Sequence, residues 1–221
     1  MIKAFLFDLD GVLTDTSEFH YRGWKRLADE ENLAFDRADN EALRGVSRRE
    51  SLLLMLKGRV VPEAQMQAWM DRKNAYYLEL VEKMTPADLL PGAKELLVEI
   101  RASGLKIAIA SSSKNAGLVI DRLALAPFID ALVDGNMVTL SKPAPDLFLK
   151  AAELVGTKPD ESVVVEDAAA GVEAGKAGGM WTVGLGPVER VGIADLVVPS
   201  LDGVHLAYIL AELDKPGINH P

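Results

Sequence analysis

The chain has 221 residues and a formal net charge of -9, with 24 Lys and Arg against 33 Asp and Glu. An acidic chain without a polybasic run is a poor match for a broad nucleic-acid surface, and the absence of cysteine excludes disulfides, thiolate metal sites and a cysteine nucleophile. The N-terminal apolar run is too short for a signal peptide, and no stretch approaches the roughly 18 apolar residues that span a membrane. We therefore expect a soluble, cytoplasmic protein.

The first apolar segment, residues 4–7, stops at Asp8 and is followed by Asp10 and Gly11. A short run bounded in this way predicts a buried parallel strand that leads into a loop. Two carboxylates in one loop are hard to explain by packing, because Asp is rarely buried without a partner or a metal. Considered alone, the segment could equally be a strand followed by an Asx turn.

The pattern is then helical from residue 17 to about residue 86, with no strand-like alternation. From residue 93 onward, short apolar strands alternate with helices of about ten residues, which predicts βα units on a parallel sheet. Strands are predicted at 105–110, 129–135, 162–167, 180–185 and 194–199, and helices at 93–102, 115–125, 145–155, 168–177 and 204–213. Residues 215–221 are predicted to be unstructured.

Polar groups follow the predicted strands: Asp8 and Asp10, the run from Ser111 to Asn115, and the pair Glu166 and Asp167, with Lys142 between the last two. The carboxyl ends of parallel strands share one edge of a sheet, so these groups should converge. Several carboxylates together need a hard cation, and oxygen ligands suit Mg²⁺. A carboxylate nucleophile, a metal, a hydroxyl and a lysine predict phosphoryl transfer, with Asp10 placed for acid–base work.

Four segments, DLDGVLTDT (8–16), ASSSKN (110–115), SKPAPDLF (141–148) and VVVEDAAAGVEAG (163–175), resemble the four motifs of the haloacid dehalogenase superfamily in order and spacing. The resemblance covers essentially the whole chain. It implies an α/β fold, with a Rossmann-like parallel-sheet core in residues 1–15 and 88–221 and a helical cap domain, residues 16–87, inserted after the first strand.

The same resemblance implies a role for each motif residue. Asp8 would be the nucleophile and Asp10 the general acid/base, while Ser111 and Lys142 would hold the transferring phosphoryl group. The implied Mg²⁺ ligands are Asp8, Asp10 through its backbone carbonyl, Glu166 and Asp167. Which of the last two acids binds the metal directly stays open.

Most members of the superfamily hydrolyse phosphate esters, but HYRGW (20–24), LRGVSRRES (43–51), DRKN (71–74) and TPADLLPG (85–92) resemble the β-phosphoglucomutase branch. That branch interconverts β-D-glucose 1-phosphate and β-D-glucose 6-phosphate through β-glucose 1,6-bisphosphate, which also phosphorylates the nucleophile. The implied substrate-binding residues are His20, Trp24, Gly45, Val46, Ser47, Arg48, Ser51, Lys73, Ser113, Lys114 and Asn115. The alternative is a Mg²⁺-dependent sugar-phosphate phosphatase of the same superfamily.

Some of these assignments depend on the resemblance alone. Without it, His20 could be an ordinary cap residue, and either Arg48 or Arg49 could be a solvated charge. The sequence also departs from the branch at Arg44, where lysine is common, and at Ser112, where alanine is common. For partners we expect a small sugar phosphate, with no nucleic acid and no membrane, and we expect a monomer.

Overall fold

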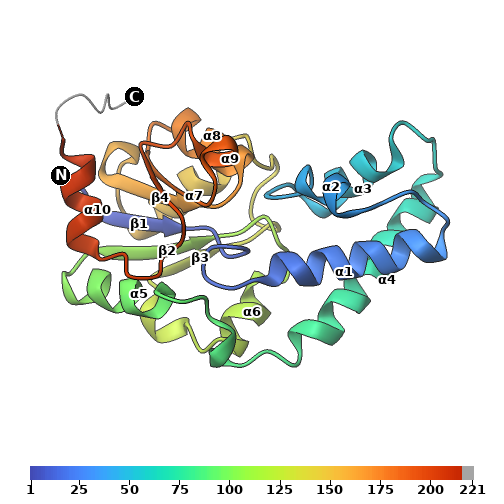
Figure 1. The fold of residues 1–221 in the computed structure, drawn as a ribbon, viewed down its shortest axis with the longest axis horizontal. Coiled ribbons are helices and arrows are strands. Elements are labelled where there is room, and N and C mark those ends of the chain that lie inside the picture. The colour runs from blue at the N-terminus through green and yellow to red at the C-terminus, as the bar shows by residue number, and fades with distance from the viewer. Residues whose placement is uncertain (216–221) are drawn as a thin grey trace.

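The computed structural model describes residues 1–215, in which six parallel strands form one sheet with the order β3-β2-β1-β4-β5-β6 (Figure 1). The strands are β1 (Ala4–Phe7), β2 (Lys106–Ala110), β3 (Ala131–Val133), β4 (Ser162–Glu166), β5 (Trp181–Leu185) and β6 (Leu196–Val198). The predicted parallel α/β fold is confirmed. Most of the predicted unstructured tail, residues 216–221, lies outside the described residues.

Helices cover both faces of the sheet because side chains alternate along each strand. Phe5 and Phe7 pack in one apolar cluster with α5 (Ala93–Ala102), α6 (Ala116–Arg122) and α10 (Leu206–Leu213). Ala4 and Leu6 face the opposite side, where they pack with α7 (Asp146–Val155) and α8 (Ala169–Ala177). The remaining core segments are the short helix α9 (Val188–Val191) and the 3₁₀ turns η2 (Ala126–Phe128) and η3 (Pro159–Glu161).

The register of the central strands sets the position of the polar loops. Phe7, the last residue of β1, pairs with Ile109 of β2 and with Val165 of β4. The residues that follow these three strands therefore emerge side by side at the same edge of the sheet, as expected for ligand-binding loops of a parallel sheet.

Four helices between β1 and α5 form a lobe beside this edge (Figure 1). They are α1 (Thr16–Glu30), α2 (Arg37–Glu41), α3 (Arg48–Leu56) and α4 (Glu63–Val81). The lobe has its own apolar cluster, which includes Trp24, Leu27, Leu52 and Trp69. The expected helical insertion after the first strand is thus present, whereas its exact limits at residues 16 and 87 stay a prediction.

The two chain segments that join the lobe to the core lie against each other. The Thr14 hydroxyl donates to the carbonyl of Asp88 at 2.8 Å, and the Leu90 amide donates to the carbonyl of Leu13 at 2.9 Å. Asp88 ends the 3₁₀ turn η1 (Pro86–Asp88), whose N-cap is Thr85. Of the helices in residues 1–215, none has the length and apolar character needed to cross a membrane.

Candidate active site

Asp8 lies at the end of β1 in a buried group of charges. The Lys142 ammonium donates to Asp8 Oδ1 at 2.5 Å and to Glu166 Oε1 at 2.6 Å, and all three side chains are buried. Burial disfavours the charged ammonium, but the two carboxylates outweigh this effect and raise the pKa of Lys142. Lys142 is therefore a permanent positive charge beside the carboxylate of Asp8.

Glu166 uses both of its carboxylate oxygens within the protein. Oε1 accepts from Lys142, and Oε2 accepts from the backbone N–H of Ala168 at 2.6 Å. The helix α8 packs directly on this side chain, since a Cβ at Gly171 would lie 1.8 Å from Oε1. In this arrangement Glu166 acts as the counter-ion that positions Lys142, and its expected role as a metal ligand stays a prediction.

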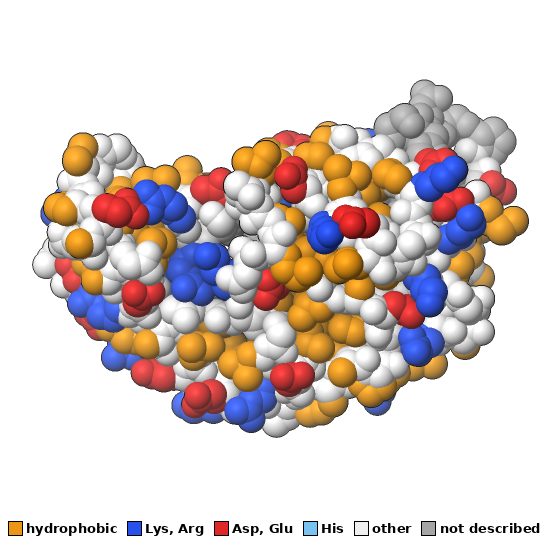
Figure 2. Space-filling model, turned by 180° about the vertical axis from the view of Figure 1, so that it is seen from behind, with side chains coloured by type: hydrophobic (Ala, Val, Ile, Leu, Met, Phe, Trp, Pro, Cys, Tyr) orange, Lys and Arg blue, Asp and Glu red, His pale blue; other side chains and the backbone are white. Residues whose placement is uncertain are grey.

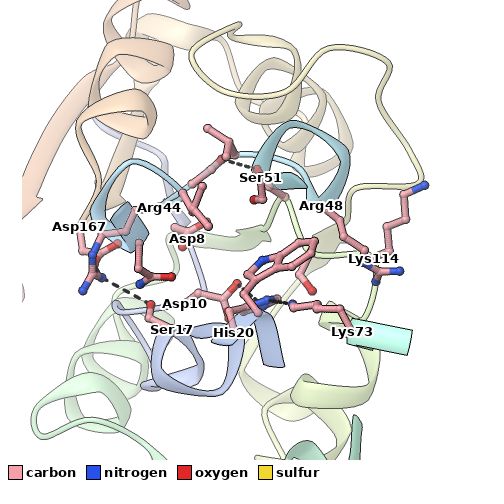
Figure 3. A pocket seen from close by; sticks show the side chains of 17 residues that line it. Asp8, Asp10, Ser17, His20, Arg44, Arg48, Ser51, Lys73, Lys114 and Asp167 are labelled. Carbon is pink, nitrogen blue, oxygen red and sulfur yellow. Dashed lines mark hydrogen bonds and ion pairs between the residues drawn. The ribbon is translucent and has the colours of Figure 1, made fainter. Parts of the chain in front are cut away.

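Asp10 points into the pocket from the loop after β1 (Figure 3). Thr16 donates to its Oδ1, Ser111 Oγ donates to Oδ2 at 3.5 Å, and His20 Nε2 lies 4.0 Å from Oδ2. Burial raises the pKa of Asp10 above its usual value, and the hydrogen bond from Thr16 opposes that rise. A carboxyl with a raised pKa is suited to both taking and giving a proton.

Asp167 lies against the Asp8–Asp10 loop, because a Cβ at Gly11 would lie 2.3 Å from its Oδ2. Arg44 Nη1 from the cap lobe donates to the same oxygen at 2.8 Å. Burial, followed by repulsion from Glu166, raises the pKa of Asp167 to about 7, although Arg44 and Arg190 oppose the rise.

The four expected metal-binding acids do not form a finished coordination group. Within residues 1–215, no three acid or histidine side chains are arranged around one ion position. Lys142 pairs with Asp8 and Glu166, and Arg44 pairs with Asp167. The donor set nevertheless fits a hard cation. Burial raises the pKa of Asp8 well above its usual value, although the charge of Lys142 opposes the rise. Carboxylate oxygens of this kind suit Mg²⁺.

Cap residues with rings and a buried lysine, Lys73, pack together next to Asp10. His20 from α1 stacks on the Tyr77 ring with centroids 4.2 Å apart, and its Nδ1 lies 2.6 Å from Lys73 Nζ. The Lys73 ammonium lies 5.0 Å from the ring centroids of Trp24 and Tyr77. Burial, with the charges of Lys73 and Arg48, holds the pKa of His20 well below its usual range, so His20 is neutral at pH 7.

The opposite end of the pocket is positively charged. Arg48 at the start of α3 donates to Asn74 Oδ1 at 2.7 Å, and Asn115 at the start of α6 donates to the same oxygen at 2.7 Å. Lys114 lies near Arg48 and also lines the pocket (Figure 3). Figure 2 shows Lys and Arg side chains where the surface is hollowed between the cap lobe and the core.

A pocket that is partly open to solvent lies between these two ends. Most of the expected site residues line it, namely Asp8, Asp10, His20, Trp24, Gly45, Val46, Arg48, Ser51, Lys73, Ser113, Lys114 and Asp167. Ser111, Lys142 and Glu166 lie buried beneath it. Ser47 is the N-cap of α3, where it accepts from the Glu50 amide, and it faces a neighbouring cavity.

Five pocket residues were not among the expected site residues: Ser17, Asn40, Leu43, Arg44 and Ser112. Asn74, which joins Arg48 to Asn115, was not expected either. Arg44, Ser112 and Asn74 are polar residues that each lie next to an expected site residue in the sequence. This position was the signal from which they could have been predicted. Asn40 lies in a helical segment of the cap and gave no such signal.

Comparisons with known proteins agree with this geometry. Residues 2–179 match the family model for haloacid dehalogenase-like hydrolases. The chain is 41% identical over 218 residues to a β-phosphoglucomutase of Bacillus subtilis, covering 97% of this chain and 96% of that protein. It is 34% identical over 212 residues to hexitol phosphatase A of Escherichia coli, covering 91% and 93%.

A solved structure is similar over nearly the whole fold. The crystal structure of a β-phosphoglucomutase from Clostridium difficile has a TM-score of 0.93 and 36% identity, covering 96% of this chain and 97% of that one. The fold, the four motifs at one edge of the sheet and these matches lead to one conclusion. The chain belongs to the haloacid dehalogenase-like hydrolase family.

Proposed function

We propose that this protein is a β-phosphoglucomutase that interconverts β-D-glucose 1-phosphate and β-D-glucose 6-phosphate through β-glucose 1,6-bisphosphate. Asp8 is the nucleophile that carries the phosphoryl group, and Asp10 is the general acid/base. Ser111 and Lys142 hold the transferring phosphoryl group. The 41% identity to a β-phosphoglucomutase over nearly the full chain supports this assignment.

The observation that carries the proposal is the two-ended pocket. Lys142 lies beside Asp8 at one end, and Arg48 and Lys114 line the other end. A phosphatase acting on a monoester needs one phosphate site, at the nucleophile. A mutase that works through a bisphosphate needs a second anion site, because one phosphate must be held while the other reacts.

Asp8, Asp167 and the backbone carbonyl of Asp10 would hold a divalent cation. When bound, Mg²⁺ neutralises charge on the transferring phosphoryl oxygens. The protein supplies the rest of the electrostatic stabilisation. The Lys142 ammonium and the Ser111 hydroxyl are preorganised at the same edge of the sheet, where they stabilise negative charge as it develops.

Each half of the reaction exchanges one phosphoryl group and one proton. In the first half, the 6-hydroxyl of β-glucose 1-phosphate attacks phosphorylated Asp8, so that the O6–P bond forms, the Asp8 Oδ–P bond breaks and Asp10 takes the hydroxyl proton. The bisphosphate then reorients in the site, so that its 1-phosphate lies at Asp8. In the second half, Asp8 attacks the 1-phosphate, the O1–P bond breaks and Asp10 returns the proton to O1, leaving glucose 6-phosphate and phosphorylated Asp8.

The test supplies Mg²⁺, β-glucose 1-phosphate and a trace of glucose 1,6-bisphosphate, and follows glucose 6-phosphate and free phosphate together. We expect glucose 6-phosphate to form rapidly, with free phosphate at no more than a few per cent of it. Phosphate release without isomerisation would overturn the mutase and favour a sugar-phosphate phosphatase. The phosphatase alternative has some support from similarity, because this chain is 34% identical to hexitol phosphatase A.

A further inference from the structure

We propose that Ser112 is a positioning residue that anchors the cap turn at Gly45 over Asp8 and so protects the aspartyl-phosphate from water. The inference rests on the proposed function. The Ser112 hydroxyl donates to the Gly45 carbonyl at 2.8 Å, and this hydrogen bond joins the core to the cap across 67 positions of the chain. Water must be excluded from a mutase intermediate, because hydrolysis would destroy the phosphoryl group before it is transferred.

The turn at Gly45 lies against Lys142 and Ala168 of the core. Gly45 has a φ of +74°, and a Cβ there would lie 3.3 Å from Ala168 Cβ and 3.7 Å from Lys142 Cδ. The positive φ favours glycine at this position. Gly45 has no side chain that could fix the turn. The position of the turn at this residue therefore depends on hydrogen bonds to its backbone, such as the one from Ser112.

The backbone around Ser112 is held in place by its contacts with the core. The amide of the preceding residue, Ser111, donates to the Val133 carbonyl of the neighbouring strand at 3.0 Å. The Gly135 backbone packs so closely that a Cβ there would lie 2.3 Å from the Ser112 carbonyl oxygen. The main chain of Ser112 is thus enclosed from the β3 side, and its hydroxyl is held toward the cap.

A second contact at the same turn joins Arg44 to Asp167 at 2.8 Å. This ion pair uses a carboxylate that we assign to the metal, so a bound cation would compete with the guanidinium for it. The hydrogen bond between Ser112 and Gly45 uses neither a metal ligand nor a charged group. It can therefore hold the turn whether or not the metal is present.

The experiment compares the ratio of free phosphate to glucose 6-phosphate in the unmodified protein, Ser112→Ala and Ser112→Thr, with exposed Ser200→Ala as the control. Loss of one hydrogen bond should raise the ratio in Ser112→Ala roughly three- to tenfold. Ser112→Thr, which keeps the hydroxyl, and Ser200→Ala should stay within about twofold of the unmodified protein. A folded Ser112→Ala protein with an unchanged ratio would overturn the anchor.

A second measurement does not depend on the reaction. Hydrogen exchange at the amides of residues 44–47 should become roughly three- to tenfold faster in Ser112→Ala, and Ser112→Thr should restore slow exchange. If the unmodified protein releases phosphate without isomerisation, the mutase proposal fails, and the exchange rates alone decide whether Ser112 anchors the turn. Unchanged exchange in Ser112→Ala would refute the anchor in either case.

Discussion

Arg48 and Arg49 are neighbours in the sequence, but their side chains have different surroundings. Arg48 lines the pocket and donates to Asn74, and burial lowers its pKa. Arg49 forms a two-pronged ion pair with Glu63 on the surface, with half of its side chain exposed. A solvated pair of this kind contributes little to binding or stability, so the geometry favours Arg48 as the phosphate ligand.

The matched variants Arg48→Ala and Arg49→Ala test this difference. Arg48→Ala should lower kcat/KM for β-glucose 1-phosphate by about tenfold or more, the usual effect of losing a hydrogen bond to a charged group. Hydrolysis of a small phosphate ester, which reaches only Asp8, should change much less. Arg49→Ala should leave both activities within about twofold. Equal loss of both activities in Arg48→Ala would contradict the role of this residue as the distant phosphate ligand.

Single residues at the strand ends could be predicted from sequence because the signal is local. The apolar run of β1 stops at Asp8, and the run of β4 stops at Glu166, which is enough to place both at one edge of a parallel sheet. The partners of these residues could not be predicted. The pairing of Lys142 with Glu166, and the contact of Ser112 with Gly45, depend on loop paths that no local pattern encodes.

At the scale of elements, the helix α8 approaches the buried charges of the site through Gly171. Gly171 lets the helix approach Glu166 so closely that a Cβ would lie 1.8 Å from Oε1. Glu166 in turn holds Lys142 beside Asp8. The packing of one helix on one strand therefore determines where the ammonium lies. The sequence predicted the helix from its pattern, but it gave no sign of this close approach.

Gly171→Ala should force Glu166 out of place and reduce phosphoryl transfer more than tenfold, with a loss of stability of about 1–3 kcal/mol from overpacking. Gly117→Ala is the matched control, because it lies in α6 with only Leu132 near its Cβ position, at 3.9 Å. That variant should be neutral or slightly more stable, as expected for Gly→Ala in a helix. Kinetics and urea unfolding measure both effects, and an active Gly171→Ala protein would contradict the dependence of Lys142 on α8.

At the scale of the whole molecule, the cap lobe and the core meet through polar contacts across the pocket. Asn74 joins Arg48 of the cap to Asn115 of the core, Arg44 joins the cap to Asp167, and the two connecting segments pair beside Thr14. Most of the cap packs in its own apolar cluster, but Tyr77 and Val81 of α4 pack in the cluster on one face of the sheet. The cap is therefore fixed to the core by apolar contacts at this end of α4, whereas the contacts across the pocket are hydrogen bonds and ion pairs, which a ligand or water can replace.

At the same scale, we expect a bound divalent cation to stabilise the whole protein, because acidic side chains gather at one edge of the sheet. Asp8, Asp10, Glu166 and Asp167 converge on one edge, where Lys142 and Arg44 are the cations that pair with them. Mg²⁺ at about 100 times its Kd should stabilise the fold by about 2.7 kcal/mol, which raises the unfolding temperature by roughly 5–10 °C for a chain of this size. Asp167→Asn should lose most of this rise, and exposed Asp202→Asn should keep it. Calorimetry with Mg²⁺ and with EDTA measures the difference, and an equal unfolding temperature in the two would show that these carboxylates do not bind the metal.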